Sequence, residues 1–511
     1  MNINDLVRYW GRTRPEHDAI VFGGDVLSWG EVDAASDALA RGLAARGVGK
    51  GDRVGLLMTN KPLLAHLMLA TVKLGAICVP LNFRLLAVEL LPMLRDAAPS
   101  VVVTDADLAH LLEPGHAELG FHMFAADGSD LPSADLLHVA DGPVPEVAVA
   151  DDDPAFICYT SGTTGVQKGA LLTHRSILSV GQAAAVMHGL SWRDRVMACA
   201  PLVYTGSGIS VFLQFVVYPG ATLVLLADFD PEIGLDVMER ERVTCTTMVP
   251  VIWERIAAVP GFASRDLADF TFAGAGGAPV SADLLETYRS RGIPLTQVYG
   301  LTEVSGLAAS MRYQDAVTRP GYAGLPLVGT DIRIGDPEGR TLPPGETGEI
   351  LVQGAHVMNG YWRRPEETAE AMHGAWLRTG DLGFQDDQGF LKLVDRRKDL
   401  VISGGLNIYP AELERALSGV EGVLDLAVIG VPDDRWGEVP LVVFHTRRDP
   451  AETVARLSAL ARGNLARFKQ PKHAVALPEP LPRTFSGKLA KNVLREQIRK
   501  TPDDALPLER D

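Results

Sequence analysis

The chain has 511 residues, more than one hydrophobic core usually organises, so we expect at least two domains. Hydrophobic residues make up 47% of the sequence and charged residues 22%, the balance of a soluble globular protein. The formal net charge is −16 and the pI about 5.3. This excludes a general nucleic-acid binder but leaves room for a local basic patch around an anionic ligand.

The four cysteines predict neither a metal site nor a disulfide framework. Cys78, Cys158, Cys199 and Cys245 are widely spaced and form no C-x-x-C pair, and no histidine cluster stands at metal-ligand spacing. We therefore expect buried free thiols in a reducing compartment.

Neither export nor membrane insertion is expected. Residues 1–14 lack the apolar stretch of a secretory signal. The most apolar run, residues 63–79, is interrupted by His66 and Lys73 and is too short for a membrane span. We expect a cytoplasmic protein.

The first third of the chain alternates predicted helices and strands. The sequence Ser28-Trp29-Gly30-Glu31 has capping-box spacing, and an apolar helical face follows it until Gly47. Beyond this helix we predict strands at 53–58, 76–80 and 101–104, and a helix at 63–74. That rhythm predicts a parallel sheet covered by helices.

The same rhythm returns later, with strands predicted at 221–226, 244–248 and 296–299. Short strands punctuated by Gly and Pro then predict a small barrel-like module at about 328–395. A charged stretch follows at 396–399, and the remaining residues are enough for a domain of their own. We predict an α/β N-terminal domain at 1–395, containing two helix-covered sheets and the barrel, and a smaller α+β domain at 396–511.

A glycine- and hydroxyl-rich loop lies between two apolar segments, at residues 159–169 (YTSGTTGVQKG). Glycines let backbone N–H groups converge on an anion, hydroxyls add donors and a lysine adds charge, as a polyphosphate cradle needs. A flexible linker has similar composition, but apolar flanks on both sides argue against one. The residues predicted to hold phosphates are Thr160, Ser161, Gly162, Thr163, Thr164, Gly165 and Lys168.

This loop is not the phosphate loop of the G-x-x-x-x-G-K-[ST] type. Gln167 stands where that pattern needs its second glycine, and Gly169 follows Lys168 where the pattern needs Ser or Thr. The loop therefore indicates another family of phosphate-binding proteins.

Further motifs follow the loop, each of which alone would indicate an ordinary turn or a solvated charge run. They are GGAP at 276–279, YGLTE at 299–303, WLRTGD at 376–381, DRRKD at 395–399, SGGLNIYP at 403–410 and PRTFSGK at 482–488. Together and in this order they resemble the adenylate-forming superfamily, which includes acyl- and aryl-CoA synthetases, peptide-synthetase adenylation domains and luciferases. The resemblance runs from Trp29 to Lys488.

The resemblance implies an ATP site made from several motifs. Gly276, Gly277, Ala278 and Pro279 would line the adenine; Tyr299, Gly300 and Thr302 would face the nucleotide; Asp381 would bind the ribose hydroxyls and Arg396 the nucleotide. Glu303 is the predicted Mg²⁺ ligand, because Mg²⁺ prefers hard oxygen donors and usually takes one or two from protein.

The resemblance also implies a two-step reaction with a mobile lid. Lys488 would be catalytic, together with Thr302 and Glu303, and Lys398 would be the hinge about which the C-terminal domain rotates. Gly404 and Gly405 would lie beside the tunnel for the thiol arm of coenzyme A.

The acid-binding pocket is expected around residues 201–208, PLVYTGSG. Its predicted residues are Tyr204, Thr205, Gly206, Gly208, Gly274 and Gly306. The stretch has no acidic residue to pair with the amine of an α-amino acid, and no basic residue for a second carboxylate. Related synthetases of simple acids often have histidine where Tyr204 stands. The small residues suggest room for an apolar monocarboxylate, either aryl, alicyclic or aliphatic.

The resulting hypothesis is ATP-dependent activation of a carboxylic acid to acyl-AMP, with pyrophosphate release and transfer to coenzyme A. Transfer to a carrier protein or to an amine stays open, as does a homodimer. A non-catalytic nucleotide-binding relative is disfavoured by the presence of Lys488 and Glu303. An ATP phosphotransferase would release ADP rather than AMP.

Overall fold

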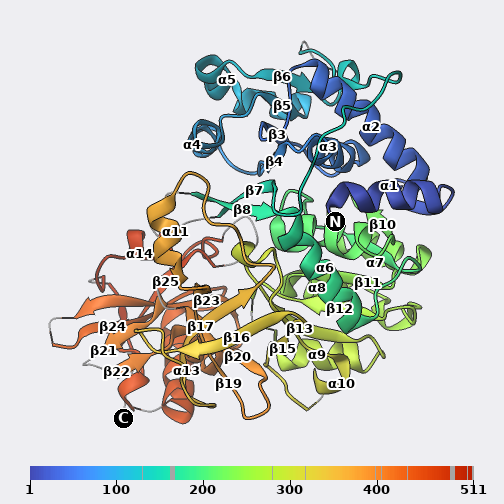
Figure 1. Cartoon of the computed structure of the whole chain (residues 1–511). Helices are drawn as coiled ribbons and strands as arrows, with labels where there is room; N and C mark the ends of the chain where they lie inside the picture. Colours follow the sequence, from blue (N-terminus) through green and yellow to red (C-terminus); the bar gives the residue numbers. More distant parts are fainter. Residues whose placement is uncertain are drawn as a thin grey trace. The chain divides into compact units, whose positions relative to one another are not determined.

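The computed structural model contains two compact units (Figure 1). The first comprises Met1–Ile332 and Leu351–Arg378, and the second Arg333–Ile350 and Thr379–Asp511. The structure describes residues 1–128, 131–160, 167–278, 280–316, 318–396, 399–403, 406–433, 435–465, 467–483, 489–502 and 504–508. The second unit groups part of the predicted barrel-like module with the C-terminal residues, and the boundary at residues 395 and 396 stays a prediction.

The N-terminal part of the first unit is a six-stranded sheet with strand order β6-β5-β3-β4-β7-β8. Only the β7–β8 pair is antiparallel. The strands are β3 (Arg53–Leu57), β4 (Ile77–Pro80), β5 (Val101–Thr104), β6 (His122–Ala125), β7 (Pro154–Thr160) and β8 (Lys168–Thr173). Its helices are α2 (Trp29–Ala45), α3 (Pro62–Lys73), α4 (Ala87–Ala97) and α5 (Glu113–Leu119). The parallel sheet predicted from the sequence is confirmed.

The predicted capping box starts helix α2. The Ser28 side chain accepts from the Glu31 backbone N–H, and the Glu31 carboxylate accepts from the Ser28 N–H at 2.8 Å. These two bonds satisfy N–H groups that a helix start otherwise leaves without partners. Just past the end of the helix, Gly47 has a φ of +82°, the left-handed conformation that glycine adopts without strain.

The second sheet of the first unit has nine strands, in the order β15-β14-β13-β12-β11-β9-β10-β1-β2. Its parallel centre consists of β1 (Asp18–Phe22), β9 (Arg195–Ala198), β10 (Thr222–Leu225), β11 (Cys245–Met248), β12 (Phe272–Ala275) and β13 (Leu295–Tyr299). Antiparallel strands β2 (Asp25–Ser28), β14 (Ala309–Ser310) and β15 (Leu325–Pro326) complete the sheet.

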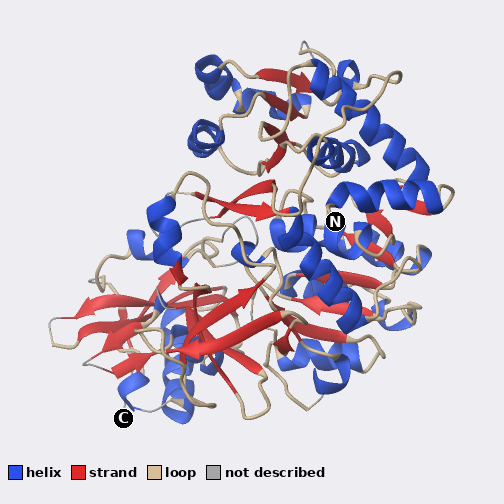
Figure 2. Ribbon diagram, in the orientation of Figure 1, coloured by secondary structure: helices blue, strands red, loops and turns tan. Residues whose placement is uncertain are grey.

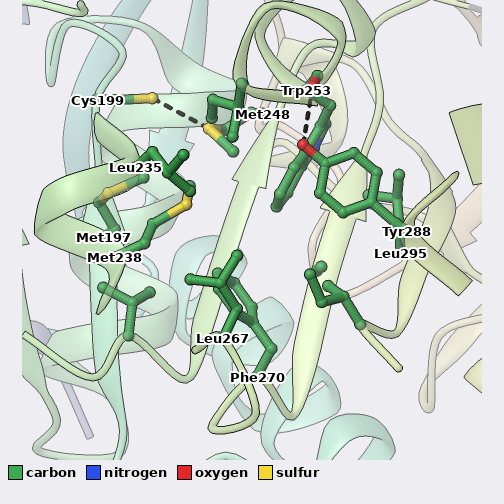
Figure 3. Close-up of a cluster of buried hydrophobic side chains, with 14 of the residues drawn as sticks. Met197, Cys199, Leu235, Met238, Met248, Trp253, Leu267, Phe270, Tyr288 and Leu295 are labelled. Atoms are coloured by element: carbon green, nitrogen blue, oxygen red, sulfur yellow. Dashed lines mark hydrogen bonds between the residues drawn. The ribbon is translucent and has the colours of Figure 1, made fainter. Parts of the chain in front are cut away.

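One face of this sheet carries a hydrophobic core shared with α7 (Pro231–Arg240), α8 (Pro250–Ala257) and α9 (Ala282–Arg289). Figure 3 shows Trp253 and Tyr288 packed together, with the Tyr288 hydroxyl donating to the Trp253 carbonyl at 2.8 Å. The Trp253 indole N–H donates to the carbonyl of Gly274 in β12 at 3.0 Å. Both large polar aromatic groups are therefore satisfied inside the core.

Helix α6 (His174–His188) and two consecutive π-helical turns, Thr205–Ile209 and Val211–Val217, also belong to the first unit. The Ile209 N–H donates to the Tyr204 carbonyl and the Tyr218 N–H to the Leu213 carbonyl, each five residues back. Turns of this kind are rare and occur often at functional sites.

Strands β16 (Thr330–Gly335), β17 (Gly348–Gly354), β18 (Met372–His373), β19 (Trp376–Gln385) and β20 (Leu391–Arg396) form a five-stranded sheet where the barrel-like module is predicted. A six-stranded sheet belongs to the second unit alone, with β21 (Val401–Ser403), β22 (Leu406–Ile408), β23 (Val423–Asp433), β24 (Gly437–Thr446), β25 (His473–Leu477) and β26 (Leu506–Pro507). Its helices are α12 (Pro410–Ala416), α13 (Pro450–Asn464) and α14 (Lys491–Gln497).

Helices and strands alternate along much of the chain, and Figure 2 shows both kinds of element by colour. The predicted α/β class is confirmed. All four cysteines are buried and free, as predicted. Among the described residues, none of the helices has the length and hydrophobicity needed to cross a membrane.

Candidate active site

Three of the predicted motifs lie where parallel strands of the nine-stranded sheet end. The segment 201–208 follows β9, the segment 276–278 follows β12, and Tyr299 is the last residue of β13. Because β9, β11, β12 and β13 are mutually parallel, their carboxyl ends share one edge of the sheet. Ligands of open α/β sheets bind outside that edge.

The predicted phosphate loop joins the two antiparallel strands of the six-stranded sheet. Thr160 ends β7 and stands opposite Lys168, which begins β8. The Thr160 hydroxyl donates to the Lys168 carbonyl at 3.4 Å. The predicted phosphate-binding residues between them, Ser161, Gly162, Thr163, Thr164 and Gly165, lie outside the described residues.

The acidic turn of the YGLTE motif is brought next to this hairpin. Thr302 and Glu303 lie in a single 3₁₀ turn, Thr302–Val304, and both are half-buried. The Tyr361 hydroxyl donates to Glu303 Oε1 at 3.0 Å. The Lys168 ammonium lies 5.3 Å from the centre of the Tyr361 ring. One tyrosine therefore contacts both predicted ATP-binding groups.

The backbone of this turn is fixed from two sides. On one side, the Ser210 hydroxyl and the Gln214 amide donate to the Ser305 carbonyl, at 3.1 and 2.6 Å. On the other, the Met358 N–H donates to the Glu303 carbonyl at 2.8 Å. Ser305 has a φ of +56°, which is uncommon outside glycine and persists only where surrounding contacts hold it.

The chemistry of this site suits Mg²⁺ carried by a nucleotide. No group of three His, Cys, Asp or Glu side chains that could hold a metal occurs among the described residues. Mg²⁺ at nucleotide sites usually takes one or two protein carboxylates and completes its shell with phosphate oxygens and water. The single carboxylate of Glu303 fits that requirement.

The predicted adenine segment leaves β12 in a tightly packed turn. A methyl group on Gly276 would lie 2.6 Å from Val298 Cγ2, so a side chain there would collide with β13. Gly277 has a φ of +82°, and Gly277 and Ala278 are both exposed. Pro279 lies outside the described residues.

Two asparagines that the sequence analysis missed hold the segment 200–204 against the other sheet. Asn60 donates to the Ala200 carbonyl at 3.0 Å and accepts from the Leu202 N–H at 2.7 Å. The Tyr204 hydroxyl donates to Asn82 Oδ1 at 3.3 Å. Burial raises the pKa of Tyr204, which keeps its hydroxyl protonated.

The glycines of the predicted acid pocket do not share one role. A methyl group on Gly206 would meet nothing within 4 Å, so this position has room. Gly208 is closely packed, because a methyl group there would collide with the backbone of Pro201 and Leu202, and its place in the acid pocket stays a prediction. At Gly306 a methyl group would lie 3.5 Å from Gly206 Cα and collide with Ser210 Oγ.

Gly274 lies between two threonines on adjacent strands. Thr247 of β11 and Thr296 of β13 are both its register partners. Both threonine hydroxyl oxygens are buried and have no hydrogen-bond partner among the described residues. A methyl group on Gly274 would lie 2.8 Å from Thr247 Oγ1, so all three positions share one face of the sheet.

The half-buried Thr205 begins the first π-helical turn.

Two predicted ATP-binding residues belong to the second unit. Asp381 in β19 is buried and stands opposite Arg396 in β20. The Asp381 N–H donates to the Thr379 hydroxyl at 3.1 Å, and Gly380 between them has a φ of +72°. The predicted hinge Lys398, the coenzyme A-side glycines Gly404 and Gly405, and the catalytic Lys488 lie outside the described residues.

The sequence analysis missed Tyr361, Asn60, Asn82, Ser210 and Gln214. Each acts through a contact to a residue at least 58 positions away in the chain, so local patterns do not reveal it. The sequence around Tyr361 offered one clue to its importance. Asn359-Gly360 predicts a turn, and two aromatic residues, Tyr361 and Trp362, follow it directly.

Comparison with known proteins supports the same family over nearly the whole chain. The profile of the AMP-binding enzyme family matches residues 7–362, and that of the AMP-binding enzyme C-terminal domain matches residues 412–488. The chain is 39% identical over 487 residues to a feruloyl-CoA synthase of Amycolatopsis, covering 95% of this chain and 97% of the relative.

Two further relatives are CoA ligases of other acids. The long-chain-fatty-acid–CoA ligase FadD13 of Mycobacterium tuberculosis is 36% identical, over 93% of this chain and 94% of its own. The structure of o-succinylbenzoate CoA synthetase (MenE) of Bacillus subtilis with its acyl-adenylate intermediate has a TM-score of 0.86 at 30% identity, covering 99% of both chains. The chain therefore belongs to the AMP-binding enzyme family and is an AMP-forming ligase of the acyl-CoA synthetase group.

Proposed function

We propose that this chain converts an apolar aryl or aliphatic monocarboxylic acid into its coenzyme A thioester, through an acyl-adenylate. The observation that carries the proposal is the cluster of Lys168, Tyr361 and Glu303, which couples the predicted phosphate loop to the predicted metal-binding turn. The relatives named as feruloyl-CoA synthase and long-chain-fatty-acid–CoA ligase support both the reaction and the substrate range.

The first half-reaction joins two anions, so its barrier is largely electrostatic. A carboxylate oxygen attacks the α-phosphorus of ATP, and the bond to pyrophosphate breaks. Lys168 and the loop 160–168 would hold the β- and γ-phosphates, and Asp381 and Arg396 the ribose and nucleotide. Lys488 would bridge the acid and the α-phosphate. Bound Mg²⁺, held by Glu303, would supply positive charge to the phosphates and the leaving group.

The acid is expected to approach past Gly206, the pocket glycine that opens onto space. Residues 201–208 carry no charged side chain, so neither an α-ammonium nor a second carboxylate would find a partner in that stretch. The buried Thr247 and Thr296 hydroxyls could each satisfy one polar atom of an otherwise apolar acid. An aryl acid bearing a hydroxyl, ether or keto oxygen fits this combination.

In the second half-reaction the thiolate of coenzyme A attacks the acyl carbon and AMP leaves. We propose that the C-terminal residues turn about Lys398, withdrawing Lys488 and bringing Gly404 and Gly405 to the thiol arm. Coenzyme A is the favoured acceptor, and a carrier protein or an amine is the second candidate. One neighbour of known structure is titled an amide bond synthetase, at 26% identity and a TM-score of 0.86. We propose a cytoplasmic location, and a homodimer stays open.

A panel of acids tests the proposal through pyrophosphate release, measured with and without coenzyme A. The panel contains unsubstituted and oxygenated aryl acids, medium- and long-chain fatty acids, an α-amino acid and malonate. We expect turnover with apolar monocarboxylates, acyl-CoA formation only with coenzyme A, and no turnover with the last two acids. The Lys488→Ala variant should lose roughly 10²- to 10³-fold in adenylation yet still form thioester from supplied acyl-adenylate. Equal loss in both half-reactions contradicts the role given to Lys488.

A further inference from the structure

Tyr361 lies between the phosphate-loop hairpin and the acidic turn, and several hydrogen bonds fix the backbone around it. The Leu171 N–H donates to the Gly360 carbonyl at 2.9 Å and the Trp362 N–H to the Gly169 carbonyl at 2.7 Å. These bonds place residues 359–362 alongside β8 like a short extra strand. The Tyr361 N–H donates to the Thr368 hydroxyl at 2.9 Å.

The side chain of Tyr361 makes two further contacts. Its hydroxyl donates to Glu303 Oε1 at 3.0 Å, and its ring lies 5.3 Å from the Lys168 ammonium. Burial, and then the negative charge of Glu303, raise the pKa of Tyr361, so the hydroxyl keeps the proton that it donates. A hydrogen bond to a charged group is among the stronger ones in proteins, and a cation over an aromatic ring adds a weaker attraction.

From this geometry we infer that Tyr361 is a positioning residue for the nucleotide: it holds the Glu303 carboxylate and the Lys168 ammonium in one fixed arrangement. The inference rests on the proposed role of Glu303 and assigns a new role to a residue outside the phosphate loop and the acidic turn. The hydroxyl limits the rotamers of Glu303, so one carboxylate oxygen is committed to Tyr361 and the other is oriented. The ring restricts where the lysine ammonium can lie. Both restrictions exist before nucleotide arrives, so binding loses less side-chain entropy.

The test is metal–nucleotide binding without turnover. Mn²⁺ replaces Mg²⁺, ATP is present and the acid is omitted, and bound Mn²⁺ is measured by electron paramagnetic resonance. Tyr361→Phe removes only the hydroxyl, and we expect it to weaken Mn²⁺–ATP binding about tenfold, the effect of losing one charge-assisted hydrogen bond. Tyr361→Leu also removes the ring and should weaken binding further.

Tyr288→Phe is the matched control, because it deletes a tyrosine hydroxyl that donates elsewhere, to the Trp253 carbonyl in the hydrophobic core. It should lower the melting temperature without changing Mn²⁺–ATP affinity.

A double-mutant cycle separates this inference from the function on which it rests. In a Glu303→Gln background, Tyr361→Phe should cause no further loss, because the hydroxyl acts through the carboxylate. If Glu303→Gln alone binds Mn²⁺–ATP as tightly as the unsubstituted enzyme, the proposed role of Glu303 fails. If Glu303→Gln weakens binding and Tyr361→Phe does not, or if the two losses are fully additive, the positioning role of Tyr361 is overturned and the proposed function stands.

Discussion

The Gln214 side-chain amide donates to the Ser305 carbonyl at 2.6 Å, which links the π-helical segment to the turn that carries Glu303. Gln214 is 1% exposed, and Ser210, one helical turn earlier, donates to the same carbonyl at 3.1 Å. Hydrogen bonds therefore connect the wall of the predicted acid pocket to the turn that carries the predicted metal ligand Glu303. A substitution in the π-helical segment should therefore alter the position of the turn that carries Glu303.

We predict that Gln214→Met and Ser210→Ala each reduce adenylation by up to about tenfold, since each removes one of two donors to Ser305. The double variant should lose less than the product of the two losses, because both donors serve one oxygen. Pyrophosphate exchange measured on the four proteins of the cycle gives the coupling. Strict additivity would show that the two contacts act independently.

Gly206 and Gly208, both in the predicted acid pocket, offer a matched comparison. Gly208→Ala forces a methyl group against the backbone of Pro201 and Leu202, so we predict destabilisation of about 1–3 kcal/mol. Gly206→Ala places its methyl group in open space and should leave the melting temperature nearly unchanged. Gly206→Ala should instead raise KM for the bulkiest acids accepted. Equal thermal shifts for both variants, measured by differential scanning fluorimetry, would contradict the packing difference.

Much of this molecule could be predicted from local sequence. Ser28 and Glu31 gave the start of α2, and the apolar run at 101–104 coincides with β5 (Val101–Thr104), because capping and burial patterns act over a few residues. The contacts of Gly208 could not be predicted the same way. Small residues indicate either room for a ligand or a close backbone approach, and only the neighbours Pro201 and Leu202 distinguish the two.

In the candidate site, too, some residues could be predicted from local sequence and others depend on distant parts of the chain. Glu303 and Lys168 stand in motifs whose residue types suit phosphate and Mg²⁺, so they could be named in advance. Tyr361 could not, because its role depends on residues 359–362 running beside β8. The π-helical turns at 205–217 were also missed, since a five-residue backbone spacing leaves no clear hydrophobic period.

The buried hydroxyl oxygens of Thr247 and Thr296 predict a measurable substrate preference. Thr247→Val keeps the shape of the side chain and removes a hydroxyl that has no partner among the described residues. We therefore expect unchanged or slightly raised thermal stability, since an unsatisfied buried hydroxyl is costly. We also expect a lower kcat/KM for oxygenated aryl acids and an unchanged value for unsubstituted ones. A uniform effect across the acid panel would show that Thr247 does not recognise a substrate oxygen.

Stability should fall in mild acid because of buried histidines, of which His174 is the clearest. Burial lowers the pKa of His174 from 6.5 to about 4, although Asp153, Asp5 and Asp151 act in the opposite direction. Its Nδ1 accepts from the Ile3 N–H at 3.2 Å, a bond that protonation at Nδ1 would break. The unfolded chain takes up a proton near pH 6.5 and the folded chain only near pH 4. The contribution of neutral His174 to the free energy of unfolding is therefore fully present above pH 6.5. It is lost as the pH falls from 6.5 to 4, and the total loss is up to about 3 kcal/mol.

His174→Asn tests this directly, because Asn Oδ1 can replace the Nδ1 acceptor but does not titrate. The melting temperature of the variant should fall less steeply than that of the unsubstituted protein between pH 7 and pH 5. Parallel melting curves across that range would exclude His174 as a source of acid sensitivity.

The central claim is that the carboxylate of the substrate attacks the α-phosphorus of ATP before coenzyme A reacts. The direct measurement uses an acid labelled with ¹⁸O in its carboxylate, with ATP, Mg²⁺ and coenzyme A, and mass spectrometry of the products. The account predicts one ¹⁸O atom in AMP and none in pyrophosphate, because the bridging oxygen of the acyl-adenylate leaves with AMP. Unlabelled AMP, or ADP with the label in inorganic phosphate, would contradict it.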